Sequence, residues 1–373
     1  MERKKTKTGG SVLFSYAKGK GDSKQAKDTF GTTCTMLLIF GVLLLLGLQC
    51  YKELLVLLGA SGEVYIEAEK YSKIIVRGCI IQIIGTGILP ILRNMGMALA
   101  GMCCMITGLV VNISVNYYLM MVVGLGIQGA AYGTVIAQSI VIIIGLMLLW
   151  RKGDYKICFG KNIKIASHIL QSGVTPFGIY LAPSITLIFT NWQCIAYGGD
   201  AVVACYAVIS YIAFPVMAML SGVGDGTQPL ISFYYGAGRL DEVAQVKKIS
   251  YILITVIGGI STILTVILSA KVGIWFGLSL DAISFLMVGL SITAISFLIA
   301  GYSKFNISFL NATMRAKQAV SLTYLESLFV NPVLLFLLPL VMNVIGIWIA
   351  TIVTAIIMLG IYMLITRKSR FTS

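Results

Sequence analysis

Glu326 is an acid that lies well inside a long apolar run, in SLTYLESLFVNP. An ionisable side chain inside a membrane-crossing segment is costly, so it indicates a function and a partner. In one interpretation, the Glu326 carboxylate binds a cation and can take up and release a proton. In the other, Glu326 lies near the end of its helix, where Arg315 or Lys317 neutralises it. The sequence leaves both interpretations open.

The other polar side chains within apolar runs are amides and one tyrosine: Asn112, Asn116, Gln138, Asn191, Gln193, Tyr211 and Asn331. Amide hydrogen bonds between helices commonly hold membrane proteins together and contribute about 0.6 kcal/mol each. The same side chains could instead line a binding site. The 34 Phe and Tyr and 16 Met residues would suit a site for flat cations, although lipid-facing and core packing explains most of them.

Enzymatic, metal and redox chemistry find little support in the sequence. The eight cysteines contain no C-x-x-C pair, and no catalytic triad or paired carboxylates appear. His168, in ASHIL, is interpreted as an interfacial side chain in preference to a proton relay. We therefore expect no enzyme activity, no cofactor and no metal site.

The composition indicates a membrane protein. The chain is 58% hydrophobic and 11% charged, with a mean hydropathy of +0.93, whereas soluble domains carry about 25% charged residues. Segments of about 20 apolar residues cross the hydrocarbon layer as helices. Ten such runs lie near residues 31–50, 73–92, 98–122, 126–150, 174–194, 201–223, 249–270, 282–302, 319–341 and 344–365.

The net charge of +14 arises from an uneven distribution of Lys and Arg. Of the 28 bases, 22 lie in alternate connections between the apolar runs. The opposite connections contain few bases and six acids: Glu53, Glu63, Glu67, Glu69, Asp200 and Asp281. This asymmetry follows the positive-inside rule and predicts a multi-pass protein of the plasma (inner) membrane with both termini in the cytoplasm. The charge gives no reason to expect a nucleic-acid partner.

An internal repeat relates residue i to residue i+217. The offset pairs SVLFSYAKGKG at 11–21 with QPLISFYYGAG at 228–238, and GAAYGT at 129–134 with GIWIAT at 346–351. In the second copy, VGDGTQPLISFYYGAG, we interpret Gln228, Pro229, Gly236 and Gly238 as architecture. Pro229 suggests a kink or break near the helix end, and the glycines suggest close packing and a turn.

The repeat predicts that the first half is incomplete. Two apolar runs precede the motif in the second half, whereas only MERKKTKTGG precedes it in the first. By the symmetry that such repeats keep, roughly 50 residues and two helices are missing. We expect either a truncated product or a start assigned too late.

Several stretches in order resemble the multidrug and toxic compound extrusion (MATE) transporters. They are GGSVLFSYAKGKGDSKQA at 9–26, ILRNMG at 91–96, NISVNYYLM at 112–120, GIQGAAYGTVIAQ at 126–138, NWQCIAYGGDAVVACYAVI at 191–209, GDGTQPLISFYYGAGRLDEV at 224–243 and NPVLLFLLPLVMNVIGIWIAT at 331–351. The resemblance implies an all-α integral membrane fold of two six-helix lobes. Ten transmembrane helices would be present, equivalent to helices 3–12 of twelve. Residues 1–150 would form the truncated N-terminal lobe, 151–165 a cytoplasmic linker and 166–373 the C-terminal lobe.

The resemblance also implies the activity. MATE transporters export organic cations in exchange for H⁺ or Na⁺, so we expect small organic cations and the lipid bilayer as partners, and a bacterial monomer. The chain lacks two features that are common in the family. Helix 5 commonly carries Asn-x-x-x-Asp, where this chain has Asn112 and Asn116. Helix 12 often carries a Pro and a Glu, where this chain has Ile352 and Ala355. The alternatives are a truncated, non-transporting remnant or membrane interaction protein, and a lipid-linked glycan flippase of the same superfamily.

Overall fold

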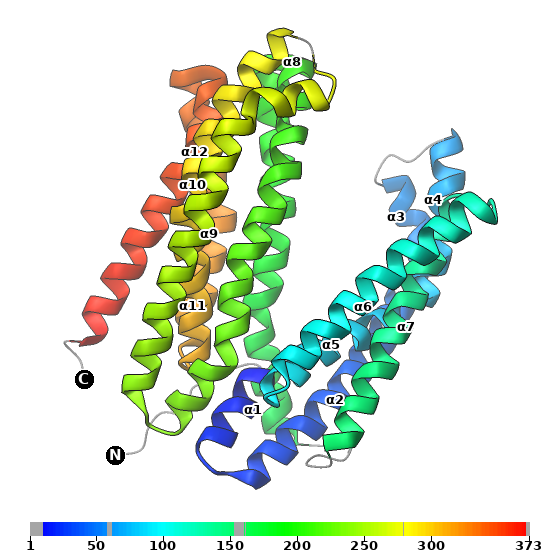
Figure 1. Ribbon diagram of the computed structural model, residues 1–373, viewed down its shortest axis with the longest axis vertical. Helices are drawn as coiled ribbons and strands as arrows, with labels where there is room; N and C mark the ends of the chain where they lie inside the picture. Colours follow the sequence, from blue (N-terminus) through cyan, green and yellow to red (C-terminus); the bar gives the residue numbers. More distant parts are fainter. Residues whose placement is uncertain (1–9, 58–61, 153–159, 161, 279, 371–373) are drawn as a thin grey trace. The chain divides into compact units, whose positions relative to one another are not determined.

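The computed structural model describes residues 10–57, 62–152, 160, 162–278 and 280–370, and these contain helices and no strand. The chain divides into two compact units, Gly10–Ile169 and Leu170–Ser373 with Met1–Gly9. We call the first the N-terminal unit and the second the C-terminal unit. The predicted linker lies partly outside the described residues, between α7 and α8 (Figure 1).

The N-terminal unit is a bundle around α5 and α7. Its elements are α1 (Gly10–Gly19), α2 (Ser23–Gly47), η1 (Leu48–Cys50), α3 (Tyr51–Leu57), α4 (Gly62–Arg77), α5 (Cys79–Asn94), α6 (Ala98–Tyr117), η2 (Tyr118–Val122) and α7 (Ile127–Lys152). Helix α7 packs against α4, α5 and α6, and α5 also packs against α1 and α2. The core includes Phe30 from α2, Leu92 from α5, Cys104 from α6 and Val141 from α7.

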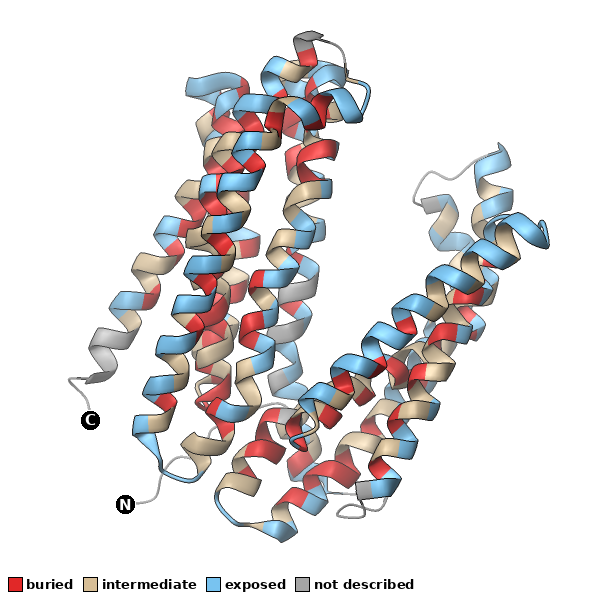
Figure 2. Ribbon diagram, viewed as in Figure 1, coloured by how far each residue is buried: buried red, intermediate tan, exposed pale blue. Residues whose placement is uncertain are grey.

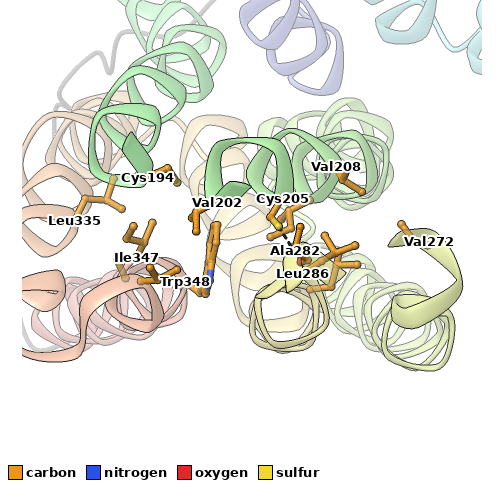
Figure 3. Close-up of a cluster of buried hydrophobic side chains, with 14 residues drawn as sticks. Cys194, Val202, Cys205, Val208, Val272, Ala282, Leu286, Leu335, Ile347 and Trp348 are labelled. Carbon is orange, nitrogen blue, oxygen red and sulfur yellow. Dashed lines mark hydrogen bonds between the residues drawn. The ribbon is translucent and has the colours of Figure 1, made fainter. Parts of the chain in front are cut away.

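The C-terminal unit is built from longer helices. Its elements are α8 (Ile163–Gly236, which begins within the N-terminal unit), α9 (Leu240–Trp275), α10 (Leu280–Ala312), α11 (Ala316–Tyr324), η3 (Leu325–Val330) and α12 (Asn331–Arg370). Helix α10 packs against α9, α11 and α12. One core cluster joins Cys205 of α8, Leu286 of α10 and Trp348 of α12 (Figure 3). In this cluster the Cys205 thiol donates to the Ala282 carbonyl at 3.1 Å.

Among the described residues, seven helices are long and apolar enough to cross a membrane: Ser23–Val56, Ala98–Val122, Ile127–Arg151, Leu181–Gly236, Leu240–Trp275, Ala282–Ala312 and Ala316–Ile365. The pair α4 and α5, bent by 59°, would make an eighth. Many large apolar side chains are exposed along these helices (Figure 2). Because a water-facing surface does not carry so much exposed apolar area, these helices form an all-helical, multi-span membrane protein.

Two of these long elements contain a non-helical residue. Helix α8 is interrupted at Gly199 (φ 60°, ψ −158°) and α12 at Asn343 (φ 51°, ψ −137°). The predicted runs 174–194 and 201–223 lie on either side of Gly199, and 319–341 and 344–365 lie on either side of Asn343. The predicted run 73–92 instead crosses the bend between α4 and α5 near Gly78.

The internal repeat appears in the backbone of the two units. Gly21 and Gly238 have φ of 76° and 77°, and the same five backbone hydrogen bonds occur at and just after each turn, at an offset of 217 residues. A left-handed φ favours glycine because it has no Cβ. Gly126, before α7, and Asn343 also match, with φ of 52° and 51°. The repeat seen in the sequence therefore corresponds to repeated turns.

In the repeat motif, the structure shows no helix break at Pro229. Helix α8 continues through Pro229 as far as Gly236, so Pro229 does not end the helix. The side chain of Gln228 donates to the hydroxyl of Ser232 at 3.0 Å, one turn further along. The chain turns at Gly238, nine residues after the proline.

Candidate functional site

A cluster of amides joins α6 and α7 in the N-terminal unit. Asn116 Nδ2 donates to Asn112 Oδ1 at 3.3 Å, one helical turn away on α6. Asn112 Nδ2 in turn approaches Thr134 Oγ1 on α7 at 3.5 Å, the limit of a hydrogen bond. The Oδ1 atom of Asn116 is buried and has no hydrogen-bond partner. The cluster is therefore neutral and retains one unused acceptor.

Glycines on α7 bring the two helices this close. A Cβ at Gly133 would lie 1.9 Å from Asn116 Oδ1, and one at Gly129 would lie 2.9 Å from the backbone carbon of Leu119. Leu119 belongs to η2, a π-helical segment that follows Asn116 and widens the end of α6. Such segments are frequent at functional sites.

Gln138 extends the polar face of α7 toward α5. It lies one turn beyond Thr134, and its Oε1 atom would be 2.3 Å from a Cβ placed on Gly85. Gln138 therefore occupies the space that the missing side chain of Gly85 leaves on α5. The predicted residues Asn112, Asn116 and Gln138 thus lie on neighbouring helices of one unit, with the first two in direct contact.

Glu326 forms an ion pair within the C-terminal unit. Lys304 Nζ, on α10, lies 3.1 Å from Glu326 Oε1, and the two side chains are only 20% and 18% exposed. The second carboxylate oxygen, Oε2, is buried and has no hydrogen-bond partner. Glu326 lies in η3, the π-helical segment between α11 and α12. The sequence interpretation that named Arg315 or Lys317 missed this base.

Asn331 lies five residues after Glu326, at the start of α12. Its Oδ1 atom accepts from Thr186 Oγ1 of α8 and its Nδ2 atom approaches Thr354 Oγ1, each at 3.5 Å. Asn331 is buried, so these weak bonds satisfy an amide that has little access to solvent. The acid therefore lies within the π-helical segment, and the amide follows directly after it.

The remaining predicted residues lie apart from these clusters. Tyr211 is 68% exposed and stacks on Phe276, with ring centroids 6.0 Å apart. Asn191 is half-buried on α8, two residues before the buried Gln193. Neither Asn191 nor Tyr211 belongs to the network around Asn331 or to the Glu326 pair.

The sequence analysis missed the side chains that complete both clusters: Thr134, Thr186, Lys304 and Thr354. Lys304 had a detectable signal, because a single base and a single acid in apolar runs on consecutive helices are expected to pair. The threonines had none, since a hydroxyl in a membrane helix usually bonds to its own backbone.

The two clusters differ in the chemistry that they can support. The N-terminal cluster offers neutral amide and hydroxyl groups, which can accept hydrogen bonds but carry no charge. The C-terminal cluster holds a carboxylate that could exchange its lysine partner for another cation. The described residues include no group of three His, Cys, Asp or Glu side chains that could hold a metal ion.

A multi-span helical bundle with polar groups buried in its spans is the architecture of a membrane transporter. The family model named MatE matches residues 6–118 and 177–337. The chain therefore belongs to the MATE family, whose members are membrane transporters.

Two curated relatives are bacterial proteins. The chain is 26% identical over 281 residues to "Probable multidrug resistance protein YoeA" of Bacillus subtilis, a match that covers 71% of this chain and 60% of the relative. It is 24% identical over 254 residues to "Multidrug export protein MepA" of Staphylococcus saprophyticus, which covers 67% and 55%. The chain thus spans somewhat over half the length of these relatives.

Solved structures show the same fold at low sequence identity. One is the outward-facing conformation of a multidrug resistance MATE family transporter of the MOP superfamily, with a TM-score of 0.91 and 19% identity, covering 96% of this chain and 82% of that one. Another is a MOP superfamily transporter from Pyrococcus furiosus, with a TM-score of 0.89, 20% identity and the same coverage. At such identities the likeness defines the fold alone.

Proposed function

We propose that the chain is a secondary active transporter that exports small organic cations in antiport with H⁺ or Na⁺. The observation that carries the proposal is Glu326, a carboxylate within a membrane segment whose cationic partner is a lysine 3.1 Å away. The names of the bacterial relatives, which refer to multidrug export and resistance, support the substrate class.

In this proposal, Glu326 is the group at which cations exchange. A carboxylate in a span attracts a proton, a Na⁺ ion or an organic cation, since each compensates its charge where water cannot. Within the C-terminal unit, Asn331 contributes a neutral oxygen that orients a substrate without holding it too tightly, and within the N-terminal unit the amide pair Asn112 and Asn116 offers neutral oxygens of its own. Transport would proceed by alternating access, with the two units rocking to open the site to each side of the membrane.

We further propose ten spans with both termini in the cytoplasm of a bacterial cell. The interruptions at Gly199 and Asn343 support this number, since each divides a helix that is too long for a single crossing. The asymmetry of Lys and Arg supports the orientation within the plasma membrane. We expect the protein to act as a monomer.

The alternative of a lipid-linked glycan flippase is less well supported. A flippase site would need several bases to hold a pyrophosphate, whereas the predicted spans and their ends offer few bases, among them Arg77 and Lys304. The charge of Lys304 is compensated by Glu326. The C-terminal cluster therefore favours a cationic substrate over an anionic one.

The proposal is tested with ethidium efflux from cells that lack their own exporters and express the full chain. Glu326→Gln removes the charge and keeps the size of the side chain, so we expect efflux to fall at least about tenfold. The matched control is Glu242→Gln, which removes an acid paired with Arg239 at the surface and leaves efflux near the wild-type rate.

The coupling ion is identified in proteoliposomes of the same chain with an imposed H⁺ or Na⁺ gradient. Only one gradient should drive ethidium transport. Efflux by Glu326→Gln at the wild-type rate, with an unchanged response to both gradients, would show that Glu326 does not couple transport. No efflux from cells that contain folded wild-type chain would contradict the proposed function itself.

A further inference from the structure

Lys304 places a positive charge where the proposed function requires a cation to bind. The Nζ atom is 3.1 Å from Glu326 Oε1, and both side chains are about four-fifths buried. A lysine carries its charge at the end of a flexible four-carbon stem, so the ammonium group can leave the carboxylate without moving the helix. The pair thus has the chemistry of an acid already occupied by an internal cation.

We propose that Lys304 is a tethered competitor for the cation site at Glu326. In the absence of a bound cation its ammonium group occupies the carboxylate, and a Na⁺ ion or organic cation that binds Glu326 displaces it. This inference rests on the proposed function, since it assumes that Glu326 is the cation site. It goes further by assigning Lys304 a role in setting the affinity of that site.

The incomplete bonding of Glu326 favours a pair that opens. An ionised carboxylate can accept about four hydrogen bonds, but Oε2 of Glu326 is buried and has no hydrogen-bond partner. A buried ion pair repays the loss of water only when further hydrogen bonds satisfy its remaining atoms. The Lys304 pair lacks that support on one oxygen, so an incoming cation can compete with it.

The location of Glu326 in a π-helical segment provides a second reason. In η3 (Leu325–Val330) the backbone departs from regular α-helical bonding, and such segments are frequent at functional sites. A salt bridge that only fastened two helices together would gain nothing from this irregular backbone. A carboxylate that exchanges one cation for another would benefit, because the irregular backbone lets its side chain change position.

The competition makes a quantitative prediction. The apparent dissociation constant equals the intrinsic one divided by the fraction of molecules in which the site is free. If the lysine occupies Glu326 about nine-tenths of the time, cations bind about tenfold more weakly than to a free site, which corresponds to about 1.4 kcal/mol. When no cation is bound, Lys304 compensates the charge of Glu326. The C-terminal unit therefore avoids the cost of an unpaired carboxylate in the apolar layer.

The test measures equilibrium binding of two probes, ethidium and ²²Na⁺, to the full chain in lipid nanodiscs at one pH. In Lys304→Gln we expect at least one probe to bind about tenfold more tightly than in the wild type. Lys304→Arg keeps the positive charge and should bind both probes no more tightly than the wild type. Lys317→Gln, which removes an exposed lysine from α11, is the matched control and should leave binding unchanged.

A purely structural salt bridge predicts the opposite sign. If Lys304 only fastens α10 to η3, Lys304→Gln loosens the site, so that both probes bind more weakly or as before, and this outcome overturns the inference. Should Lys304→Gln fail to fold, Glu326→Asp gives the same contrast. The shorter acid reaches Lys304 less well but keeps its charge, so competition predicts tighter binding and a structural role predicts weaker binding.

The inference and the proposed function can fail separately. Wild-type efflux that depends on Glu326, together with unchanged or weaker binding in Lys304→Gln, overturns only the role of Lys304. Wild-type and Lys304→Gln chains that are folded but bind neither probe would remove the cation site at Glu326, and the inference would fall with it.

Discussion

The helix pair α6–α7 of the N-terminal unit and the pair formed by α11–η3 and α12 in the C-terminal unit share a scaffold but differ in charge. In each, a glycine packs against the backbone of the helical segment before it: Gly129 meets Leu119 of η2, and Gly346 meets Leu338, which lies before the interruption of α12 at Asn343. Each also bonds an amide to a threonine on the following helical segment. Only the C-terminal pair contains an acid, Glu326, and this acid pairs with a base on α10, Lys304.

This difference shows that the two units share backbone features but not charged side chains. The duplicated features are turns and close contacts, which depend on backbone geometry and tolerate little change. The charged groups are not duplicated, because at the offset of 217 residues Glu326 corresponds to Leu109 and Lys304 to Gly87. The π-helical segments also differ in position, since η2 ends the helix in one unit and η3 interrupts it in the other. The proposed cation chemistry therefore belongs to one unit.

The largest expected effect on stability comes from breaking the ion pair. Lys304→Met leaves Glu326 without a partner and should lower the free energy of unfolding by about 2–3 kcal/mol, less than for a fully buried pair because both side chains are partly exposed. The double variant Lys304→Met/Glu326→Leu should recover most of this loss. Thermal unfolding in detergent measures both. An equal loss in the single and double variants would show that packing, and not charge, distinguishes this unit.

A smaller effect on stability is expected at the two glycines that pack most closely against neighbouring backbone, Gly346 and Gly129. A Cβ at Gly346 would lie 2.5 Å from the backbone of Leu338, and one at Gly129 would lie 2.9 Å from that of Leu119. Gly346→Ala and Gly129→Ala should each lower the free energy of unfolding by about 1–3 kcal/mol, since overpacked backbone must shift.

Gly360→Ala is the control for this pair, because no atom lies within 4 Å of its Cβ position. Alanine in an open helical site should leave stability unchanged or raise it by up to about 1 kcal/mol. If all three variants unfold at the same temperature, close helix packing is not the feature that the two units share.

The sequence predicted the membrane helices well because a span must satisfy every backbone group internally. It also predicted the repeat and the turn at Gly238, since glycine at a left-handed φ is visible in the sequence. It missed the bend near Gly78, where α4 and α5 meet at 59°, because the apolar residues 74–76 before Gly78 and 79–81 after it fall in a single predicted run. The sequence predicted a kink or a break near Pro229, and the helix is not broken there but ends at Gly236, before the turn at Gly238.

The site was harder to predict than the fold. Asn112 and Asn116 are four residues apart, so helical spacing alone places them on one face. Lys304 and Glu326 are 22 residues apart on different helices. Whether they meet depends on how α10 and η3 are rotated, and a π-helical segment changes that rotation in a way that hydropathy does not record. Whether Asn112, Asn116, Gln138, Asn191, Tyr211, Glu326 and Asn331 bind substrate stays a prediction.

The smallest effect is expected in the neutral clusters, where the two units should behave alike. Asn112→Ala removes side-chain hydrogen bonds at 3.5 and 3.3 Å, and Asn331→Ala removes two at 3.5 Å. Each variant should therefore lower the free energy of unfolding by only about 0.6 kcal/mol for each bond removed. Thermal unfolding in detergent compares them, with Asn306→Ala, which breaks a 2.7 Å bond from Tyr251, as a control of larger effect. If Asn112→Ala alone abolished ethidium efflux with its stability intact, the neutral N-terminal cluster would be a substrate site in its own right. The two units would then differ less in function than in charge.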